Sequence, residues 1–529
     1  MRRAFGYAAI VVCLLLVGAG IYIERYLKTI NPRIKERVVA ALSDRFDADV
    51  TLDSIAVSVY PEPNVTGEGL SIRHRQWPDH EPIIFIKRFY ARTSFSTLVE
   101  RSNRVSLLRL EGLTIYVPPR GRAAGEQKTE LNHQVGSSEP GQDRTRFRFL
   151  IETIEANGAR LEIAPKTAGK EPLRFDFSAL TLHSAGRADP MRFSAKLTNP
   201  KPPGLIDTTG TFGPWQRDDP RATALAGEYS FRNADLGVFK GIAGTLSSTG
   251  RYKGVLQAVE VDGSTDTPDF TLKRGGDSVH LQTTFHSVVN GTDGDTLLDP
   301  VRASFRKSEF VCRGGIEHHQ GRPGKTISLD AQTTQARMED ILALVVGGRP
   351  FVTGDVDFQS KIVVPPGKED VIDKLMLDGR FRLMSARFSS AKVEERLTAL
   401  SDRARGISRK EQKEERQGQR GVASELSGTF KLERGTVVFS RLGFSVPGAH
   451  IRLAGTYNLP SGETNMKGIF RMHSTLAGTQ SGIKHVLLMP LDPLFEKDGA
   501  GFEVPIFITG TREHPDIKAE VFHRRVTIH

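Results

Sequence analysis

After an N-terminal segment, apolar and polar residues alternate in short runs along most of the chain. Met191, Phe193 and Leu197 fall in one phase of such a run, while Arg192 and Lys196 fall in the other. Successive side chains of a strand point to opposite faces, so this period of two predicts strands with one apolar and one polar face. The runs end at Gly, Pro, Asn or Asp, which favours hairpins over the crossovers of an α/β fold. We therefore expect a mostly β protein built on an antiparallel sheet with a few short covering helices.

The N-terminal segment reads FGYAAIVVCLLLVGAGIYI over residues 5–23 and contains no charged residue. A run of this length can cross a bilayer as a helix. Arg2 and Arg3 precede it, and the positive-inside rule then places the N-terminus in the cytoplasm and the bulk of the chain on the other side. A cleaved signal peptide is the alternative, with residues 17–19 as its cleavage site. The apolar run continues to Ile23 without a polar region before that site, which favours an uncleaved anchor.

The distribution of charge argues against a nucleic-acid partner, and the number of cysteines argues against disulfides and a cysteine metal site. Lys plus Arg exceed Asp plus Glu by 73 to 62, giving a net charge of +11. This excess is spread along the chain instead of forming a stripe, so we do not expect nucleic acid as a partner. Cys13 lies inside the apolar segment and Cys312 is the only other cysteine. The outer region therefore has neither a disulfide framework nor a cysteine metal site.

Three segments have helical patterns, one before the alternation begins and two that interrupt it. Asn31 and Pro32 suit a helix start, and they precede Ile34, Val38, Leu42 and Phe46, which recur on one helical face. We expect this helix to cover the first edge of the sheet. Residues 336–346 predict a short helix that stops at Gly347 and Gly348. Residues 392–417 predict a helix carrying Val393, Leu397 and Leu400 that ends in the charged run ISRKEQKEERQGQR.

The same patterns divide the chain into six segments. They are a cytoplasmic N-terminus and membrane anchor (1–27), a helix and β region (28–118), a flexible polar loop (119–144), a central β region (145–335), helical interruptions with a charged insert (336–421), and a C-terminal β region (422–529). Two passages are similar to each other, VSLLRLEGLTIYV at 105–117 and FLIETIEANGARLEI at 149–163. Each predicts strand, turn, strand, with the turn at Gly112 or Gly158.

No pattern for catalysis or metal binding is complete. Residues 315–326 end in Gly-Lys-Thr like a phosphate loop, but His319 stands where the first glycine is required. His318 and His319 are neighbours and would point to opposite faces of a strand, so they are poorly placed to share a metal. Asp293, Asp295 and Asp299 lie among turn residues, where Asp commonly bonds its own backbone; a calcium site is the alternative, without the glutamate that closes the familiar loop. We expect no catalytic residue, no metal, no cofactor and no enzymatic activity.

An ordered set of passages runs along the chain: the anchor, the N-terminal helix and the strands that follow it, FKGIAGTLSSTGRYKGVLQAVEVDGSTDTPDFTL in the centre, and RGTVVFSRLGFSVPGAHIRLAGTYNL and VPIFITGTREHPDIKAEV near the end. In this order they resemble the AsmA-like proteins of the bacterial envelope. The resemblance implies a single-pass inner-membrane protein that faces the periplasm and serves outer-membrane biogenesis. The larger relatives look like bridge-type lipid transfer proteins, which implies an elongated, curved, groove-like antiparallel sheet around an apolar groove. A phospholipid or related envelope lipid is then the implied partner.

An antiparallel sheet with one apolar face must cover that face or leave it for a ligand. A closed sandwich and an open groove both satisfy the alternation, and a scaffolding or assembly factor for envelope proteins is the alternative function. The candidate groove residues are Phe147, Phe149, Phe175, Phe177, Met191, Phe193, Leu197, Phe381, Leu383, Phe430, Ile451, Leu453, Phe470 and Met472. The apolar residues 481–495 near the C-terminal end either cap the last sheet edge or dock onto a membrane or an envelope protein partner.

Overall fold

The computed structural model describes residues 32, 34–40, 42–43, 48–58, 62–74, 81–93, 104–117, 150–164, 172–185, 189–214, 216, 220–273, 276–291, 293–319, 324–390, 394–395, 397–398, 401, 424–472, 502–511, 514–521 and 524–527. The predicted anchor (5–23), the polar loop (119–144), Phe147, Phe149 and the apolar segment 481–495 lie outside these ranges. Among the described residues, no helix combines the length and the apolar character needed to cross a membrane. The anchor therefore stays a prediction.

The chain forms two compact units, one of Met1–Asn233 with Arg251–Gln257 (unit 1) and one of Ala234–Gly250 with Ala258–His529 (unit 2). The boundary between them falls inside the predicted central region 145–335. The predicted segments 336–421 and 422–529 both contribute strands to unit 2. Strand β13 (Thr245–Val255) has residues in both units.

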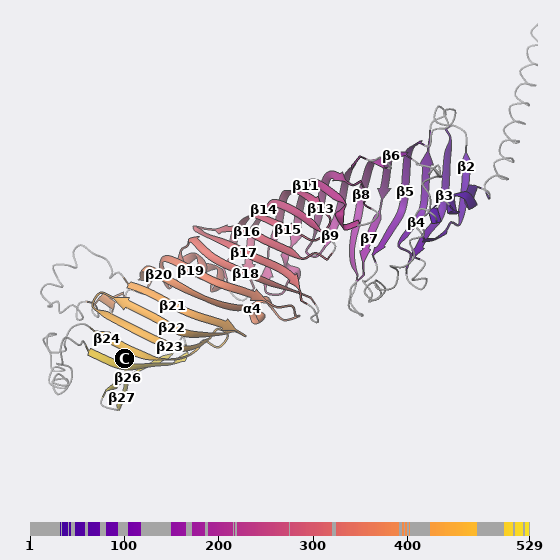
Figure 1. Ribbon diagram of the computed structural model, residues 1–529. Coiled ribbons are helices and arrows are strands. Elements are labelled where there is room, and N and C mark those ends of the chain that lie inside the picture. Colours follow the sequence, from indigo (N-terminus) through magenta and orange to yellow (C-terminus); the bar gives the residue numbers. More distant parts are fainter. Residues whose placement is uncertain are drawn as a thin grey trace, which may run out of the picture. The chain divides into compact units, whose positions relative to one another are not determined.

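Unit 1 is a sheet of strands drawn in indigo to magenta in Figure 1. Strand β3 pairs antiparallel with β1 and β2 on one side and with β4 on the other, and β4 pairs with β5. Strands β8 to β11 follow as an antiparallel series. The strands are β1 (Ala48–Thr51), β2 (Ser54–Ser58), β3 (Asn64–His74), β4 (Ile84–Arg92), β5 (Arg104–Val117), β6 (Leu150–Asn157), β7 (Ala159–Ile163), β8 (Leu173–Ala185), β9 (Met191–Pro200), β10 (Pro203–Phe212) and β11 (Ala224–Asp235), with the 3₁₀ turn η2 (Pro220–Ala222) before β11.

The two predicted hairpins in unit 1 are wrong. Strand β5 continues through Gly112, and β6 and β7 run one after the other in the same direction, separated only by Gly158. Both β6 and β7 pair parallel with β5. The two glycines have the same positive φ of +64°. A left-handed glycine suits a turn between strands, but here the chain continues in the same direction past each glycine, and the pairing with β4 and β5 keeps its register.

The predicted N-terminal helix is confirmed over residues 34–40. Ile34, Val38 and Leu42 pack against the core of the sheet, whose buried members include Val50 and Leu70. The helix therefore covers part of the sheet's apolar face instead of its edge alone. Phe46, the fourth residue of the expected helical face, lies outside the described residues.

Unit 2 is an antiparallel series in which each strand from β14 to β27 pairs with the next along the chain. Its strands appear in magenta to yellow in Figure 1. They are β12 (Ile242–Ala243), which also pairs with β14, then β14 (Ala258–Leu272), β15 (Val279–Val289), β16 (Thr296–Phe305), β17 (Ser308–His318), β18 (Lys325–Gln335), β19 (Val352–Val364), β20 (Met376–Phe388), β21 (Ser424–Glu433), β22 (Thr436–Val446), β23 (Ala449–Asn458), β24 (Glu463–Met472), β25 (Phe502–Thr511), β26 (Pro515–Val521) and β27 (Arg524–Thr527).

Short helical elements join some of these strands. They are η3 (Leu236–Val238), α3 (Met338–Val345) and α4 (Val371–Lys374). The helix predicted at 336–346 is thus confirmed as α3, and it stops before Gly347, whose backbone N–H donates to the Leu342 carbonyl. Of the helix predicted at 392–417, the structure describes helical residues between 394 and 401, and Leu397 packs against Val446, Ala449 and Met472. The prediction of a mostly antiparallel β-fold with few helices is confirmed.

Helix α3 is held against the sheet by a buried carboxylate. Asp340, 5% exposed, accepts hydrogen bonds from the Lys307 backbone N–H (2.9 Å) and the Ser308 hydroxyl (2.8 Å). At the start of the helix, Arg337 donates to Glu339 (2.8 Å) and to Asp355 (2.6 Å) on β19. These contacts direct the apolar side of α3 onto the sheet, where Ile341 and Leu342 pack on buried Leu383.

Candidate functional site

One face of unit 2 is apolar from strand to strand. Residues that are direct cross-strand partners lie on the same face of a sheet, so the pairing register traces rows across it. One row without a charged residue crosses from β14 to β26: Gly263, Phe285, Val301, Cys312, Ala331, Ser360, Gly379, Phe430, Phe439, Gly455, Met466, Ile508 and Ile517. We call the side that carries this row the apolar face and the opposite side the outer face.

A second row on the apolar face runs through Phe358, Phe381, Gly428, Leu442, Leu453, Gly468 and Ile506. A third runs through Val356, Leu383, Leu426, Phe444, Ile451, Phe470 and Val504. The apolar face is therefore at least three rows deep, and it continues across seven or more neighbouring strands.

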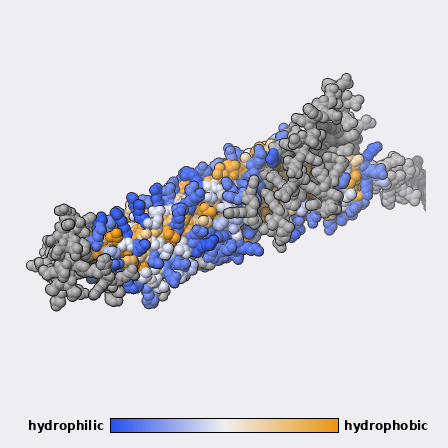
Figure 2. All heavy atoms as spheres, turned by 60° about the horizontal axis from the view of Figure 1, so that its bottom comes forward, coloured by the Kyte–Doolittle hydropathy of each residue, from blue (hydrophilic) through white to orange (hydrophobic). Residues whose placement is uncertain are grey.

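Most side chains of the apolar face are half-buried. Phe381, Leu453 and Phe470 are examples, whereas charged partners on the outer face are mostly exposed. Some residues are fully buried: Leu383 is 0% and Val356 3% exposed beside α3, and away from this helix Val504 and Ile506 are each 6% exposed. In Figure 2, apolar residues on the left, where unit 2 lies, form a broken strip between hydrophilic margins. Helix α3 thus covers the part of the apolar face around Leu383, whereas half-buried residues such as Leu453 and Phe470 lie beyond it.

The described candidate residues of unit 2 all lie on this apolar face. They are Phe381, Leu383, Phe430, Ile451, Leu453, Phe470 and Met472. Three of them present little surface: Leu383 lies under α3, Phe430 is 9% exposed among other aromatic rings, and Met472 is 6% exposed beside Leu397. These three are packing positions, while Phe381, Ile451, Leu453 and Phe470 are half-buried and accessible.

The candidate residues of unit 1 share an apolar face of their own sheet. One row there runs through Ala159, Phe177, Leu197, Ile206 and Phe231. Phe175 pairs with Leu161, Phe193 with Leu182, and Met191 with Phe212. Phe175, Phe177, Met191, Phe193 and Leu197 are half-buried. Phe147 and Phe149 lie outside the described residues.

Sequence reasoning missed several members of the apolar face, including Phe285, Phe358, Phe439 and Phe444. Phe285, Phe358 and Phe444 have polar residues or glycine on both sides, so the phase of their own strands was the available signal, whereas Phe439 follows two valines and has no clear phase. It also missed the glycines that stand in these rows, because a glycine has no hydropathy phase of its own.

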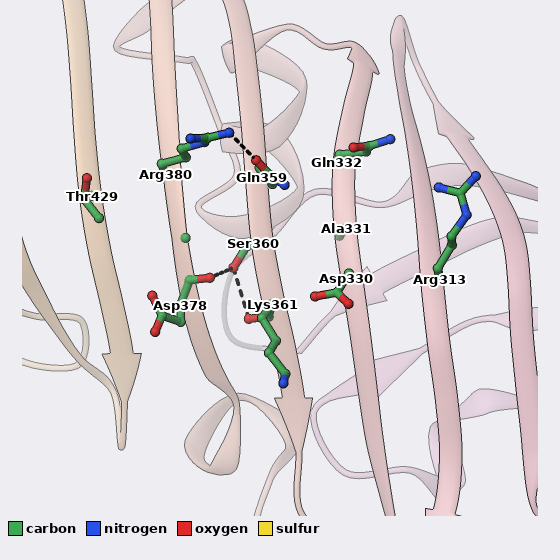
Figure 3. A pocket seen from close by; sticks show the side chains of 11 residues that line it. Arg313, Asp330, Ala331, Gln332, Gln359, Ser360, Lys361, Asp378, Arg380 and Thr429 are labelled. Carbon is green, nitrogen blue, oxygen red and sulfur yellow. Dashed lines mark hydrogen bonds between the residues drawn. The ribbon is translucent and has the colours of Figure 1, made fainter.

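The outer face carries a ladder of alternating charges. Arg313, Asp330, Lys361, Asp378 and Lys431 are successive cross-strand partners on β17 to β21. Arg313 also donates to Asp299 on β16 (2.8 Å), and Lys431 lies 3.1 Å from Asp378. Figure 3 shows the hollow of about 420 Å³ that these strands form on this side. Its opposite charges already face one another, so the hollow is better explained by sheet pairing than by a ligand.

The part of the chain that the structure describes contains no group of three or more His, Cys, Asp or Glu residues that could hold a metal ion. Asp293 accepts a hydrogen bond from the Asp295 backbone N–H (3.0 Å), as expected for a turn. Asp295 in turn pairs with Lys325 (3.1 Å). Cys312 is a half-buried free thiol on the apolar face, and burial raises its pKa. A raised thiol pKa lowers the thiolate fraction and makes a nucleophilic role unfavourable.

No family model, no curated protein and no solved structure matches this chain. The resemblance to AsmA-like proteins stays a prediction from the motifs themselves.

Proposed function

We propose that this chain is a protein of the bacterial envelope whose apolar sheet face binds or conducts a phospholipid or a related lipid. In this proposal, residues 5–23 anchor it in the inner membrane, the N-terminus is cytoplasmic, and the sheets lie in the periplasm and serve outer-membrane biogenesis. The observation that carries the proposal is the uncharged row from Gly263 to Ile517 across β14 to β26, most of which the described helices leave uncovered.

The physical support is the nature of that face. A large contiguous apolar surface marks an interaction site or invites aggregation. Acyl chains are suitable occupants because burying each CH₂ group contributes about 0.8 kcal/mol without any polar recognition. The outer face, with its paired charges, keeps the other side of the same strands in water. Such a sheet needs no catalytic group to hold lipid.

Site-specific photocrosslinking tests the proposal. A photoreactive residue would replace Phe381 or Phe470 in unit 2 or Phe193 in unit 1, in full-length protein incubated with vesicles of phosphatidylethanolamine and phosphatidylglycerol. Matched positions on the outer face are Lys431 on β21 and Arg452 on β23. Both are exposed, and their strands pair with those of Phe381 and Phe470. We expect lipid adducts at the three phenylalanine positions and few at the two outer positions.

The scaffolding alternative makes a different prediction. A face occupied by an envelope protein would give protein adducts of defined mass at the same three positions when the experiment is done in intact membranes. Equal adduct yields on both faces, or no lipid adduct at Phe381, Phe470 and Phe193, would rule out the lipid proposal.

A further inference from the structure

Aromatic residues of the apolar face repeatedly stand directly opposite a glycine on the neighbouring strand. In unit 2, the pairs are Phe285 with Gly263, Phe381 with Gly428, Phe430 with Gly379 and Phe439 with Gly455. In unit 1, they are Phe89 with Gly67 and Phe193 with Gly210. A glycine inside a strand weakens it unless something packs there, so this recurrence calls for a reason.

The pair of Phe381 and Gly428 shows what the glycine does. A Cβ atom added at Gly428 would lie 2.7 Å from Cε1 and 3.0 Å from Cζ of the Phe381 ring. At Gly67, a Cβ atom would lie 2.3 Å from Cζ of Phe89. Carbon atoms in contact prefer about 3.5–4.0 Å, so each ring occupies space that any other residue would fill. The Phe381 and Phe89 rings thus lie over the glycine backbone. At Gly379, Gly455 and Gly210, a Cβ atom would first meet backbone atoms of the other neighbouring strand.

The position of the Phe381 ring matters for the neighbouring surface. Its centroid is 6.2 Å from that of Phe430, which in turn packs 6.2 Å from Phe358 and 6.5 Å from Phe439. Phe381 is half-buried and Phe430 almost fully buried. A Phe381 ring raised from the sheet would therefore rise above this aromatic cluster, since the close-packed, buried Phe430 ring beside it cannot move to compensate.

We propose that Gly428 is a positioning residue: it lets the Phe381 ring lie close to the sheet, and so sets the depth available to an acyl chain over β20 and β21. Gly67 has the same role for Phe89 in unit 1. This inference rests on the proposed lipid-binding function and names the residues that fix the depth of its site. An alanine at position 428 requires the ring to move by about 1 Å to restore normal contact.

The test compares Gly428→Ala with Gly443→Ala. Gly443 lies on the adjacent strand β22 but on the outer face, opposite Ser427 and Arg452. A Cβ atom there would lie 3.4 Å from the Ser427 hydroxyl oxygen, which is an ordinary contact. Neither glycine has a positive φ, so the two substitutions have similar backbone effects. Binding is measured with full-length protein and vesicles containing phosphatidylethanolamine with a fluorescent label on its headgroup, once with saturated and once with cis-unsaturated chains.

We expect Gly428→Ala to weaken binding at least about fivefold and Gly443→Ala to leave it unchanged. The bent unsaturated chain should lose more than the straight chain, a selectivity that a purely structural defect would not produce. Adding Phe381→Leu to Gly428→Ala should restore binding, because the smaller side chain removes the clash. Equal binding by both alanine variants would overturn the inference while leaving the lipid function intact.

Two further outcomes separate the proposals. If wild-type protein binds no labelled lipid, the proposed function fails, and the inference fails with it. If Gly428→Ala does not fold, the single variant Phe381→Leu tests the inference. Its smaller side chain should deepen the site and strengthen binding of the unsaturated lipid relative to the saturated one. An unchanged ratio in that variant would contradict the role of the pair.

Discussion

Asp330 on β18 lies directly opposite Lys361 on β19, and Lys361 lies directly opposite Asp378 on β20. A shift of one residue in either strand would move these charges to the apolar face, because side chains alternate between faces. The ladder therefore opposes register slips that the apolar face alone would tolerate, since many of its residues are interchangeable in size and polarity.

Charge reversal at the centre of this ladder should destabilise unit 2. Lys361→Glu replaces two opposite-charge pairs with two like-charge pairs, and we expect a loss of about 1–2 kcal/mol in the free energy of unfolding. The loss should shrink in 1 M salt because exposed charges are screened. Thermal unfolding at low and high salt measures both effects. Lys368→Glu makes the same charge change in an exposed connection and should have little effect; a comparable loss there would contradict the role of the ladder.

Removing the carboxylate of Asp340 should release helix α3 from the sheet. Asp340→Ala leaves the Lys307 N–H and the Ser308 hydroxyl without their buried acceptor, which costs about 1.5–3 kcal/mol. Hydrogen exchange of the α3 amides in full-length protein measures the local opening. Asp340→Asn keeps an acceptor and should lose less. Asp355→Ala breaks an exposed ion pair with Arg337 and should cost under about 1 kcal/mol. Equal protection in all three variants would show that Asp340 does not hold the helix.

Much of the fold could be predicted from strand phase. Phe381, Leu453 and Phe470 were placed on one side of their strands by alternation, and their strands pair so that these sides coincide. The helices of residues 34–40 and of α3 followed from periodicity and a glycine stop. Phase cannot tell whether a face is covered, however. Leu383 and Phe381 have the same phase on the same strand, yet only Leu383 lies beneath α3.

Register-dependent features could not be predicted. The partner of Phe381 is a glycine only because β20 and β21 pair as they do, and a local pattern carries no register between strands separated by an insert. The passages around Gly112 and Gly158 were similar for a real reason, since they form neighbouring strands with a left-handed glycine at the matching position. Their local sequence could not separate a left-handed glycine within a strand from one in a turn, because both conformations favour glycine.

Alanine at Gly112 or at Gly158 should be destabilising, but to different extents. Both glycines have φ of +64°, so a Cβ atom costs about 1–2 kcal/mol from backbone strain at each. Gly158 has open space around it, whereas a Cβ atom at Gly112 would lie 2.9 Å from Cβ of Lys87. We therefore expect Gly112→Ala to lose more stability than Gly158→Ala in urea unfolding of unit 1. Gly158→Asn should be nearly neutral because asparagine tolerates this conformation. The reverse order of the two alanine variants would contradict the close contact of Gly112 with Lys87.

Cys312 provides a native reporter of the apolar face once Cys13 is replaced by serine. Alkylation by iodoacetamide requires the thiolate, and burial raises the pKa of the Cys312 thiol. Its reaction should therefore be slower in folded than in unfolded protein near pH 8, and the rate should continue to rise at a pH where an ordinary thiol has levelled off.

Vesicles of phosphatidylethanolamine and phosphatidylglycerol should slow the alkylation of Cys312 further, because Cys312 lies between Val301 and Ala331 in the uncharged row. Thr429→Cys in protein lacking both native cysteines places a thiol on the exposed outer face and should react at an ordinary rate with or without vesicles. If folding left the pH profile of Cys312 unchanged, its buried position on the apolar face would be wrong; if vesicles slowed both thiols equally, the protection would not be specific to that face.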